Sequence, residues 1–121
     1  MTKTVLTIDD SRTMRDMLLM ALEDAGYTVI QAVDGIDGLE TLAARGADVV
    51  ITDINMPRMD GFGVIEGVRA DPNHRATPVL VLTTESDVEK KARARAAGAT
   101  GWIVKPFDPA KLVDAVRRVA A

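Results

Sequence analysis

Nine residues near the middle of the chain read Val49-Val50-Ile51-Thr52-Asp53-Ile54-Asn55-Met56-Pro57. A dense apolar run of this length, bounded by turn-forming residues, predicts a β-strand that is buried on both faces. The run ends abruptly at Asp53, and Pro57 stops regular structure a few residues later. Asp53 is therefore expected at the carboxyl end of a strand, where open α/β sheets place their ligand crevices.

Strand and helix patterns alternate on both sides of this stretch. Short runs of strand-forming residues occur at 5–8, 28–30, 49–53, 79–83 and 101–104. Helical patterns follow each of them, over 14–25, 36–42, 62–68, 86–97 and 112–119. We interpret the three methionines of the first helix as core filler. The alternation predicts an α/β fold, a doubly wound, flavodoxin-like (βα)5 domain whose parallel five-stranded sheet has the order 2-1-3-4-5.

Length and composition narrow the class of protein. The chain has 121 residues, of which 47% are hydrophobic and 27% charged, so residues 1–121 are expected to form one soluble globular domain. Because it contains no cysteine, disulfides and Cys-ligated zinc are excluded. A net charge of −3 argues against non-specific binding of nucleic acid. No apolar run reaches membrane-spanning length and no signal peptide is recognisable, so a cytoplasmic location is expected.

Polar residues follow four of the predicted strands. Strands 1, 3, 4 and 5 present at their carboxyl ends Asp9 and Asp10, Asp53, Thr83 and Lys105. Taken singly, each has a plain structural explanation, such as a helix cap, a loop acid, a strand terminus or an exposed ammonium. In a parallel sheet, however, they all lie at one edge, and five such residues at four strand ends make coincidence improbable.

The three carboxylates predict a metal site. Brought together, they repel one another, and a hard divalent cation offsets that repulsion. Mg²⁺ suits one or two carboxylates with a backbone carbonyl and water. We assign Asp9, Asp10 and Asp53 to Mg²⁺, with the carbonyl of Asn55 as a further ligand.

The same group of residues indicates phosphoryl transfer. A carboxylate can form a covalent phospho-intermediate, and the reaction needs mainly positioning and neutralisation of charge on the phosphoryl oxygens. Mg²⁺, the ammonium of Lys105 and the hydroxyl of Thr83 would supply that neutralisation. Asp53, at the end of the central strand, is the predicted acceptor.

At this point the sequence resembles response-regulator receiver domains over essentially the whole chain, and it is most similar to stand-alone chemotaxis regulators of the CheY type. The blocks that match in order and spacing are Asp9-Asp10, Asp53-Ile54-Asn55-Met56-Pro57, Thr83 and Lys105-Pro106. The resemblance implies transfer of a phosphoryl group from a histidine kinase's phosphohistidine to Asp53, with Mg²⁺ required. It implies that Lys105 contacts the phosphoryl group and the acidic site, that Thr83 moves to bond a phosphoryl oxygen, and that the Lys105–Pro106 bond is cis.

The resemblance also assigns roles to three residues near the site. Trp102 occupies the place of an aromatic residue, more usually Tyr or Phe, that turns inward when the threonine moves. As an alternative, Trp102 is a packing residue that does not switch. Asn55 and Glu85 lie two residues after the predicted acceptor and the threonine, where family members flank the path of the hydrolytic water.

Partners follow from the resemblance as well. It implies a CheA-like chemotaxis histidine kinase and a flagellar motor switch protein; the alternative is a phosphorelay intermediate that serves a phosphotransfer protein. The protein would catalyse only its own phosphorylation and dephosphorylation. We expect a monomer that has no effector domain and that binds neither membranes nor nucleic acids. Basic residues on the fourth helix indicate either a docking face or a solvated helix held by i,i+4 pairs such as Asp87–Lys91 and Glu89–Arg93.

Two other classes of protein compete with this interpretation. A Mg²⁺-dependent phosphohydrolase would use Asp53 as nucleophile, but it usually places a second acid two residues on, where this chain has Asn55. A flavodoxin-like nucleotide binder would need a Gly-rich or hydroxyl-rich loop after the first strand, where Asp9 and Asp10 instead repel phosphate.

Overall fold

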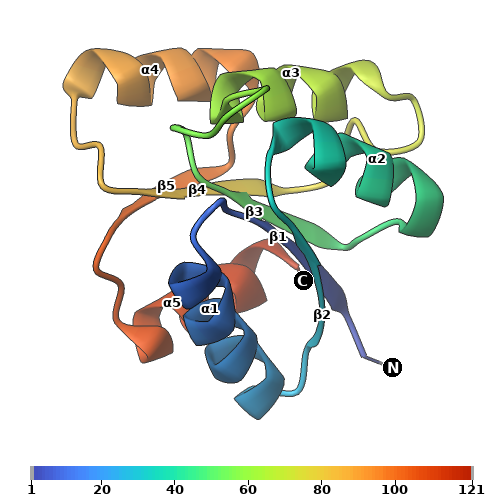
Figure 1. The fold of residues 1–121 in the computed structure, drawn as a ribbon, viewed down its shortest axis with the longest axis vertical. Helices are drawn as coiled ribbons and strands as arrows, with labels where there is room; N and C mark the ends of the chain where they lie inside the picture. The colour runs from blue at the N-terminus through green and yellow to red at the C-terminus, as the bar shows by residue number, and fades with distance from the viewer. Residues whose placement is uncertain (1, 121) are drawn as a thin grey trace.

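The computed structural model describes residues 2–120, which form a five-stranded parallel sheet in the order β2-β1-β3-β4-β5 (Figure 1). The strands are β1 (Thr4–Ile8), β2 (Thr28–Ala32), β3 (Val49–Thr52), β4 (Val79–Thr83) and β5 (Gly101–Val104). The helices are α1 (Arg12–Asp24), α2 (Gly35–Arg45), α3 (Gly61–Ala70), α4 (Val88–Ala97) and α5 (Pro109–Val119). The predicted fold class and strand order are confirmed. Within the described residues, no helix combines the length and apolar character that a bilayer span requires.

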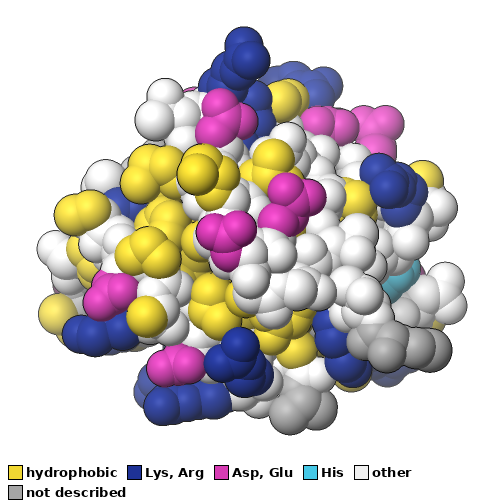
Figure 2. All heavy atoms as spheres, turned by 90° about the horizontal axis from the view of Figure 1, so that it is seen from below, with side chains coloured by type: hydrophobic (Ala, Val, Ile, Leu, Met, Phe, Trp, Pro, Cys, Tyr) yellow, Lys and Arg dark blue, Asp and Glu magenta, His cyan; other side chains and the backbone are white. Residues whose placement is uncertain are grey.

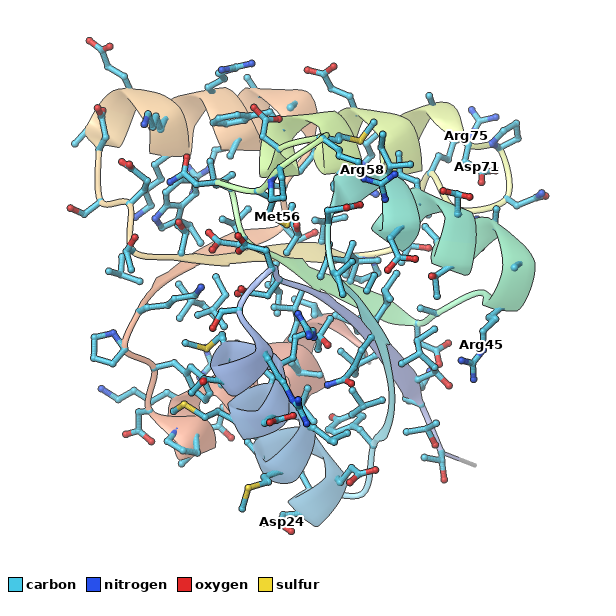
Figure 3. The ribbon with its side chains drawn as sticks, in the orientation of Figure 1. Asp24, Arg45, Met56, Arg58, Asp71 and Arg75 are labelled. Carbon is cyan, nitrogen blue, oxygen red and sulfur yellow. The ribbon has the colours of Figure 1, made fainter. Side chains whose placement is uncertain are left out.

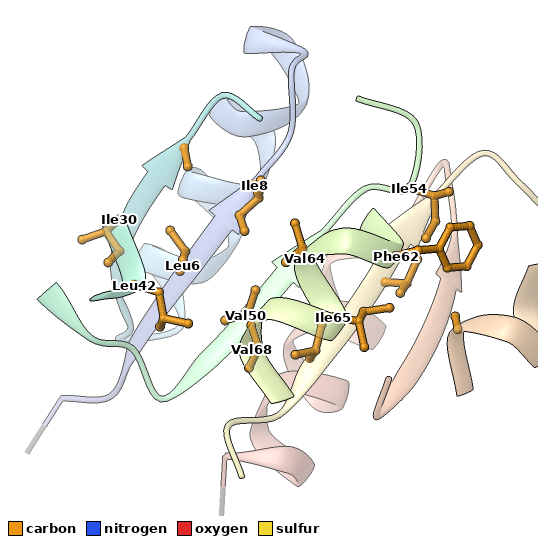
Figure 4. Close-up of a cluster of buried hydrophobic side chains, with 14 residues drawn as sticks. Leu6, Ile8, Ile30, Leu42, Val50, Ile54, Phe62, Val64, Ile65 and Val68 are labelled. Atoms are coloured by element: carbon orange, nitrogen blue, oxygen red, sulfur yellow. The ribbon is translucent and has the colours of Figure 1, made fainter. Parts of the chain in front are cut away.

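Helices cover both faces of the sheet. In Figure 1, α2, α3 and α4 lie above it and α1 and α5 below it. The upper core joins strand residues such as Leu6 and Val50 to Phe62 and Ile65 of α3 (Figure 4). The lower core joins other strand residues to α1 and α5. All four residues of β3 are buried, which explains why Val49, Val50 and Ile51 follow one another without alternating polar residues.

A short polar side chain begins every helix in the described chain. Each accepts a backbone N–H of the first turn and so satisfies one of the donors that a helix start leaves unpaired. These caps are Ser11, Asp34, Asp60, Asp87 and Asp108. The cap at Asp87 explains one difference from the predicted elements, because α4 begins at Val88 and not at residue 86.

The methionines of α1 correct a second prediction. Met14 packs against the lower core, but Met17 is 45% exposed and Met20 68% exposed. The buried stripe of α1 is formed by Leu18 and Leu22. With 3.6 residues per turn, Met20 lies nearly opposite Leu18 and cannot share its face. Hydrophobic side chains therefore gather on the outer face beside acidic and basic ones, as Figure 2 shows for the side of the molecule formed by α1 and α5.

A buried hydroxyl in β1 leads to a stability prediction. Thr7 is fully buried, and its Oγ1 has no hydrogen-bond partner among the described residues. A buried polar group without a partner is costly. We therefore expect the nearly isosteric change Thr7→Val to raise the free energy of unfolding by about 1 kcal/mol, measured as a higher urea midpoint at an unchanged slope.

The neighbouring strand offers a matched control for that measurement. Thr52 is equally buried, but its hydroxyl donates to the backbone oxygen of Asp53 at 2.9 Å. Thr52→Val should therefore lower the free energy of unfolding, because it removes the hydrogen bond from the Thr52 hydroxyl to the backbone oxygen of Asp53. Equal effects of Thr7→Val and Thr52→Val would show that the missing partner of Thr7 has no energetic consequence.

Candidate functional site

The carboxyl ends of four strands bring the predicted site residues to one edge of the sheet. Asp9 directly follows β1, Asp53 directly follows β3, Thr83 is the last residue of β4, and Lys105 directly follows β5. The backbone N–H of Asp53 donates to the oxygen of Ile8 at 3.0 Å, which holds the ends of β1 and β3 level. Asp53 was predicted as the last residue of its strand and lies one residue beyond it.

Lys105 lies between two of the carboxylates. Its Nζ donates to Asp9 Oδ2 at 2.8 Å and to Asp53 Oδ2 at 3.0 Å. The three side chains are only 9%, 3% and 12% exposed, respectively, so these ion pairs are shielded from water. Burial by itself would lower the pKa of Lys105, but the hydrogen bonds with Asp9 and Asp53 outweigh it and raise the pKa. The ammonium therefore stays charged at neutral pH.

The second oxygen of each of these carboxylates is bound by backbone. Asp9 Oδ1 accepts the N–H of Ser11 at 2.9 Å, and Asp53 Oδ1 accepts the N–H of Ile54 at 2.6 Å. The guanidinium of Arg15 in α1 also donates to the backbone oxygen of Asp9 at 2.7 Å. Both carboxylates are thus fixed from two sides, so that little reorganisation would accompany the binding of a ligand.

Three carboxylates converge at this edge and suit a hard cation. Asp9, Asp10 and Asp53 each offer an oxygen within 4.8 Å of the others. One ammonium, that of Lys105, offsets only part of their charge, so the cluster keeps a net charge of −2 from three carboxylates and one lysine. Asp10 is exposed and opens the cluster to solvent. An all-oxygen donor set with excess negative charge fits Mg²⁺.

A chain of hydrogen bonds leads from β4 to β5. The Oγ1 of the buried Thr83 accepts the N–H of Glu85 at 3.2 Å. The backbone oxygen of Glu85 accepts Nε1–H of Trp102 at 3.1 Å, and the Glu85 carboxylate pairs with Lys90 of α4 at 3.2 Å. Trp102 is partly buried against the upper core. The strand-end hydroxyl and the indole are therefore connected through the backbone of one residue.

The structure also shows contacts that the sequence analysis did not predict. An added Cβ at Gly61 would meet the backbone oxygen of Asp53 and approach Ile54 Cα to 2.8 Å, so the start of α3 lies directly against the predicted acceptor. Its only sequence signal is the Asp-Gly pair at 60–61, which also marks ordinary turns. The Lys105–Pro106 bond is cis, as the resemblance implied. The side chain of Asn55 is exposed.

The basic residues of α4 are held differently from the prediction. Arg93 lies over the ring of Phe62 in α3, 3.9 Å from its centroid, in a cation–π contact. Asp87 is used as the helix cap. Neither predicted i,i+4 pair is among the ion pairs of residues 2–120. The charged contacts of α4 include the Arg93–Phe62 contact and the Lys90–Glu85 pair, beside the apolar packing of Ala94 in the upper core.

Comparisons with known proteins agree with this geometry. A family model described as the response regulator receiver domain matches residues 5–117. The chain is 38% identical over 116 residues to the chemotaxis protein CheY-3 of Vibrio cholerae, covering 95% of this chain and 89% of that protein. It is 36% identical over 113 residues to the DNA-binding dual master transcriptional regulator RpaA of Synechocystis. That match covers 93% of this chain but 47% of RpaA, so the chain spans about half the length of that relative.

Solved structures show the same fold. The chemotaxis protein CheY4 of Vibrio cholerae superposes with a TM-score of 0.94 at 44% identity, covering 98% of this chain and 99% of that one. A putative response regulator from Chloroflexus aurantiacus also gives a TM-score of 0.94, at 33% identity, covering 99% of this chain and 98% of the other.

Proposed function

The chain belongs to the family of response regulator receiver domains, and we propose that it acts as a single-domain response regulator of chemotaxis-type two-component signalling, with residues 1–121 forming one receiver domain. Asp53 would accept a phosphoryl group from the phosphohistidine of a kinase. The observation that carries the proposal is the buried Lys105 ammonium held between Asp9 and Asp53 at the open edge of the sheet. The three side chains are each less than 13% exposed, so the charges that would meet a phosphoryl group act on it with little screening by water.

In the transfer step, an oxygen of Asp53 would attack phosphorus while the bond from phosphorus to the histidine nitrogen breaks, leaving an aspartyl phosphate and a free imidazole. The ammonium of Lys105 would then contact the negatively charged phosphoryl oxygens, since its Nζ already contacts Asp53 Oδ2. When bound by the carboxylates of Asp9, Asp10 and Asp53 and the carbonyl of Asn55, Mg²⁺ would supply further neutralisation of those oxygens.

Thr83 would couple phosphorylation to the surface. Its Oγ1 now accepts the backbone N–H of Glu85. After a shift toward Asp53, its own O–H would donate to a phosphoryl oxygen. A shift of Thr83 would pull on Glu85 and, through the Glu85 carbonyl, on Trp102. The change in partner binding is then a population shift, driven by better contacts of the phosphoryl group with Thr83 and Lys105 in the active arrangement.

The aspartyl phosphate would be lost by hydrolysis. We propose that Asn55 and Glu85 flank the path of the attacking water. Glu85 is paired with Lys90 and Asn55 is exposed, so both polar groups can reorient without breaking a core contact. The protein would catalyse only its own phosphorylation and dephosphorylation, in keeping with receiver domains generally, which are signal transducers and not enzymes. The phosphohydrolase alternative is not favoured.

As partners we propose a CheA-like histidine kinase and a flagellar motor switch protein. Because the protein would meet both of them in the cytoplasm, we propose a cytoplasmic location. Support comes from the chemotaxis names of CheY-3 and CheY4. A direct test incubates the protein with a phosphorylated chemotaxis kinase and then with the motor switch protein. We expect Mg²⁺-dependent transfer followed by binding of the phosphorylated monomer. Onward transfer to a phosphotransfer protein without motor binding would instead show a phosphorelay intermediate.

Trp102 provides an optical test of the coupling through Glu85. It is the one tryptophan in the sequence, so the emission reports its surroundings alone. Because its Nε1–H is bonded to the Glu85 carbonyl, we expect phosphorylation to change the emission beyond the change that Mg²⁺ produces. Phosphorylated Thr83→Ala is the control and should lose the additional change. An unchanged spectrum in the phosphorylated wild type would show that Trp102 only packs.

A further inference from the structure

Arg58 and Asp34 form a two-bonded ion pair between the loop that follows β3 and the start of α2. Arg58 Nε donates to Asp34 Oδ2 at 2.7 Å and Arg58 Nη2 donates to Asp34 Oδ1 at 3.0 Å. The Asp34 carboxylate is 7% exposed. It also caps α2 by accepting the N–H of Asp37 at 2.8 Å. Because an uncharged amide would serve as that cap equally well, the arginine fork goes beyond what the helix start requires.

The backbone of Arg58 is unusual. Glycines aside, it is the one residue with a positive φ in the described chain, at 66°. A left-handed conformation brings the Cβ of an L-residue too close to its own backbone, and it persists only where surrounding contacts enforce it. Glycine would adopt this conformation without strain. The presence of a strained arginine here indicates that its side chain has a use.

Arg58 lies in the loop that joins the phosphoacceptor to α3. This loop, residues 54–60, is closed by the N–H of Gly61 donating to Ile54 at 2.8 Å. It is pressed against α2, since an added Cβ at Gly35 would lie 2.6 Å from the backbone oxygen of Met59. Figure 3 shows Arg58 on this loop beside the first turn of α2. Among the described residues, the Arg58 side chain forms the ion pair that connects loop 54–60 to Asp34, the cap of α2.

We propose that the Asp34–Arg58 pair is a positioning clamp that fixes the backbone of loop 54–60 and thereby sets the Mg²⁺ affinity of the site. The metal part of this inference rests on the proposed function, in which the Asn55 carbonyl is a ligand. The Arg58 side chain bonds the Asp34 carboxylate, which is not among the three carboxylates of the acidic cluster. It acts through the loop, three residues after the carbonyl that must be held in place, and this makes it a positioning residue.

Two substitutions remove the Asp34–Arg58 ion pair while keeping the turn at residue 58 and the cap of α2. Arg58→Gly removes the fork and relieves the backbone strain, so a role in the turn alone would be preserved or improved. Asp34→Asn keeps an oxygen for the Asp37 N–H, so the helix cap survives while the charge is lost. Arg75→Gly is the matched control, because Arg75 is an exposed loop arginine whose side chain is in none of the ion pairs of residues 2–120.

Two measurements decide the matter. In metal-free protein, hydrogen exchange of the Gly61 amide, which closes the loop, should be at least several-fold faster in Arg58→Gly and Asp34→Asn. Calorimetry should show that the Kd for Mg²⁺ rises roughly tenfold in each of the two variants. This is the lower end of the effects expected for residues that orient a metal ligand without binding the metal. The double variant should be no weaker than either single one, because both remove the same interaction.

The outcomes are distinguishable. Unchanged Gly61 exchange, or an unchanged Mg²⁺ Kd in a less stable variant, would overturn the clamp and leave the pair a structural brace. If wild type binds no Mg²⁺, the metal assignment of the proposed function fails and the affinity part of the inference is overturned with it. Faster Gly61 exchange in the metal-free variants would still uphold the clamping of the loop.

Discussion

Lys105→Ala is expected to destabilise the metal-free protein by about 3–5 kcal/mol, the range for breaking a buried ion pair. The substitution would leave Asp9 and Asp53 buried and facing each other without the ammonium that now binds both. Saturating Mg²⁺ should recover much of the loss, because a cation that binds only the folded state replaces the missing charge. Urea unfolding with and without Mg²⁺ measures both effects.

The deficit should also depend on pH in a defined direction. In the wild type, the hydrogen bonds with Asp9 and Asp53 raise the pKa of Lys105 in the folded state. A raised pKa adds stability that is fully present below the ordinary lysine value and is lost as the pH rises through the folded-state value, so the deficit of Lys105→Ala should be full at neutral pH and shrink in alkaline solution. Lys111→Ala, at an exposed position of α5, is the control and should be neutral. Mg²⁺ affinity should not fall in Lys105→Ala, whereas response to phosphorylation should. A large loss of metal affinity would contradict the proposed role of Lys105.

Asp53→Asn is expected to abolish phosphorylation while leaving the fold intact. The asparagine oxygen can still accept the N–H of Ile54, and Lys105 keeps its bond to Asp9. Loss of one ion pair is offset by relief of repulsion within the acidic cluster, so the free energy of unfolding should stay within about 1–2 kcal/mol of wild type. Urea unfolding measures this, and Asp24→Asn, at the exposed end of α1, is the control (Figure 3). Global unfolding of Asp53→Asn would show that Asp53 is needed for folding.

The fold and most of the site could be predicted because the relevant signals are local. The apolar run at 49–52 marks a strand buried on both faces, and parallel strands end at one edge, so residues far apart in sequence converge there. Lys105 and Asp9 are separated by 96 positions but are bonded at 2.8 Å. Their convergence follows from strand order alone, without any knowledge of side-chain conformation.

The errors and omissions have physical causes of another kind. The exposed positions of Met17 and Met20 could not be read from hydrophobicity, because an apolar side chain on the outer face of a helix looks the same in sequence as one that packs in the core. The Asp34–Arg58 pair depends on a positive φ at an arginine, which no propensity predicts. The approach of Gly61 to Asp53 depends on how α3 is seated, a property of packing and not of pattern.

The most direct test of the account is the intact mass of the protein after incubation with acetyl phosphate, with and without Mg²⁺, for the wild type and Asp53→Asn. We expect one phosphoryl addition, to the wild type alone and only when Mg²⁺ is present, because the acceptor is Asp53 and the acidic cluster needs a cation before a second anionic group can approach. Addition to Asp53→Asn would place the acceptor elsewhere. No addition to a folded, Mg²⁺-binding wild type would contradict the assignment of Asp53 as a phosphoryl acceptor.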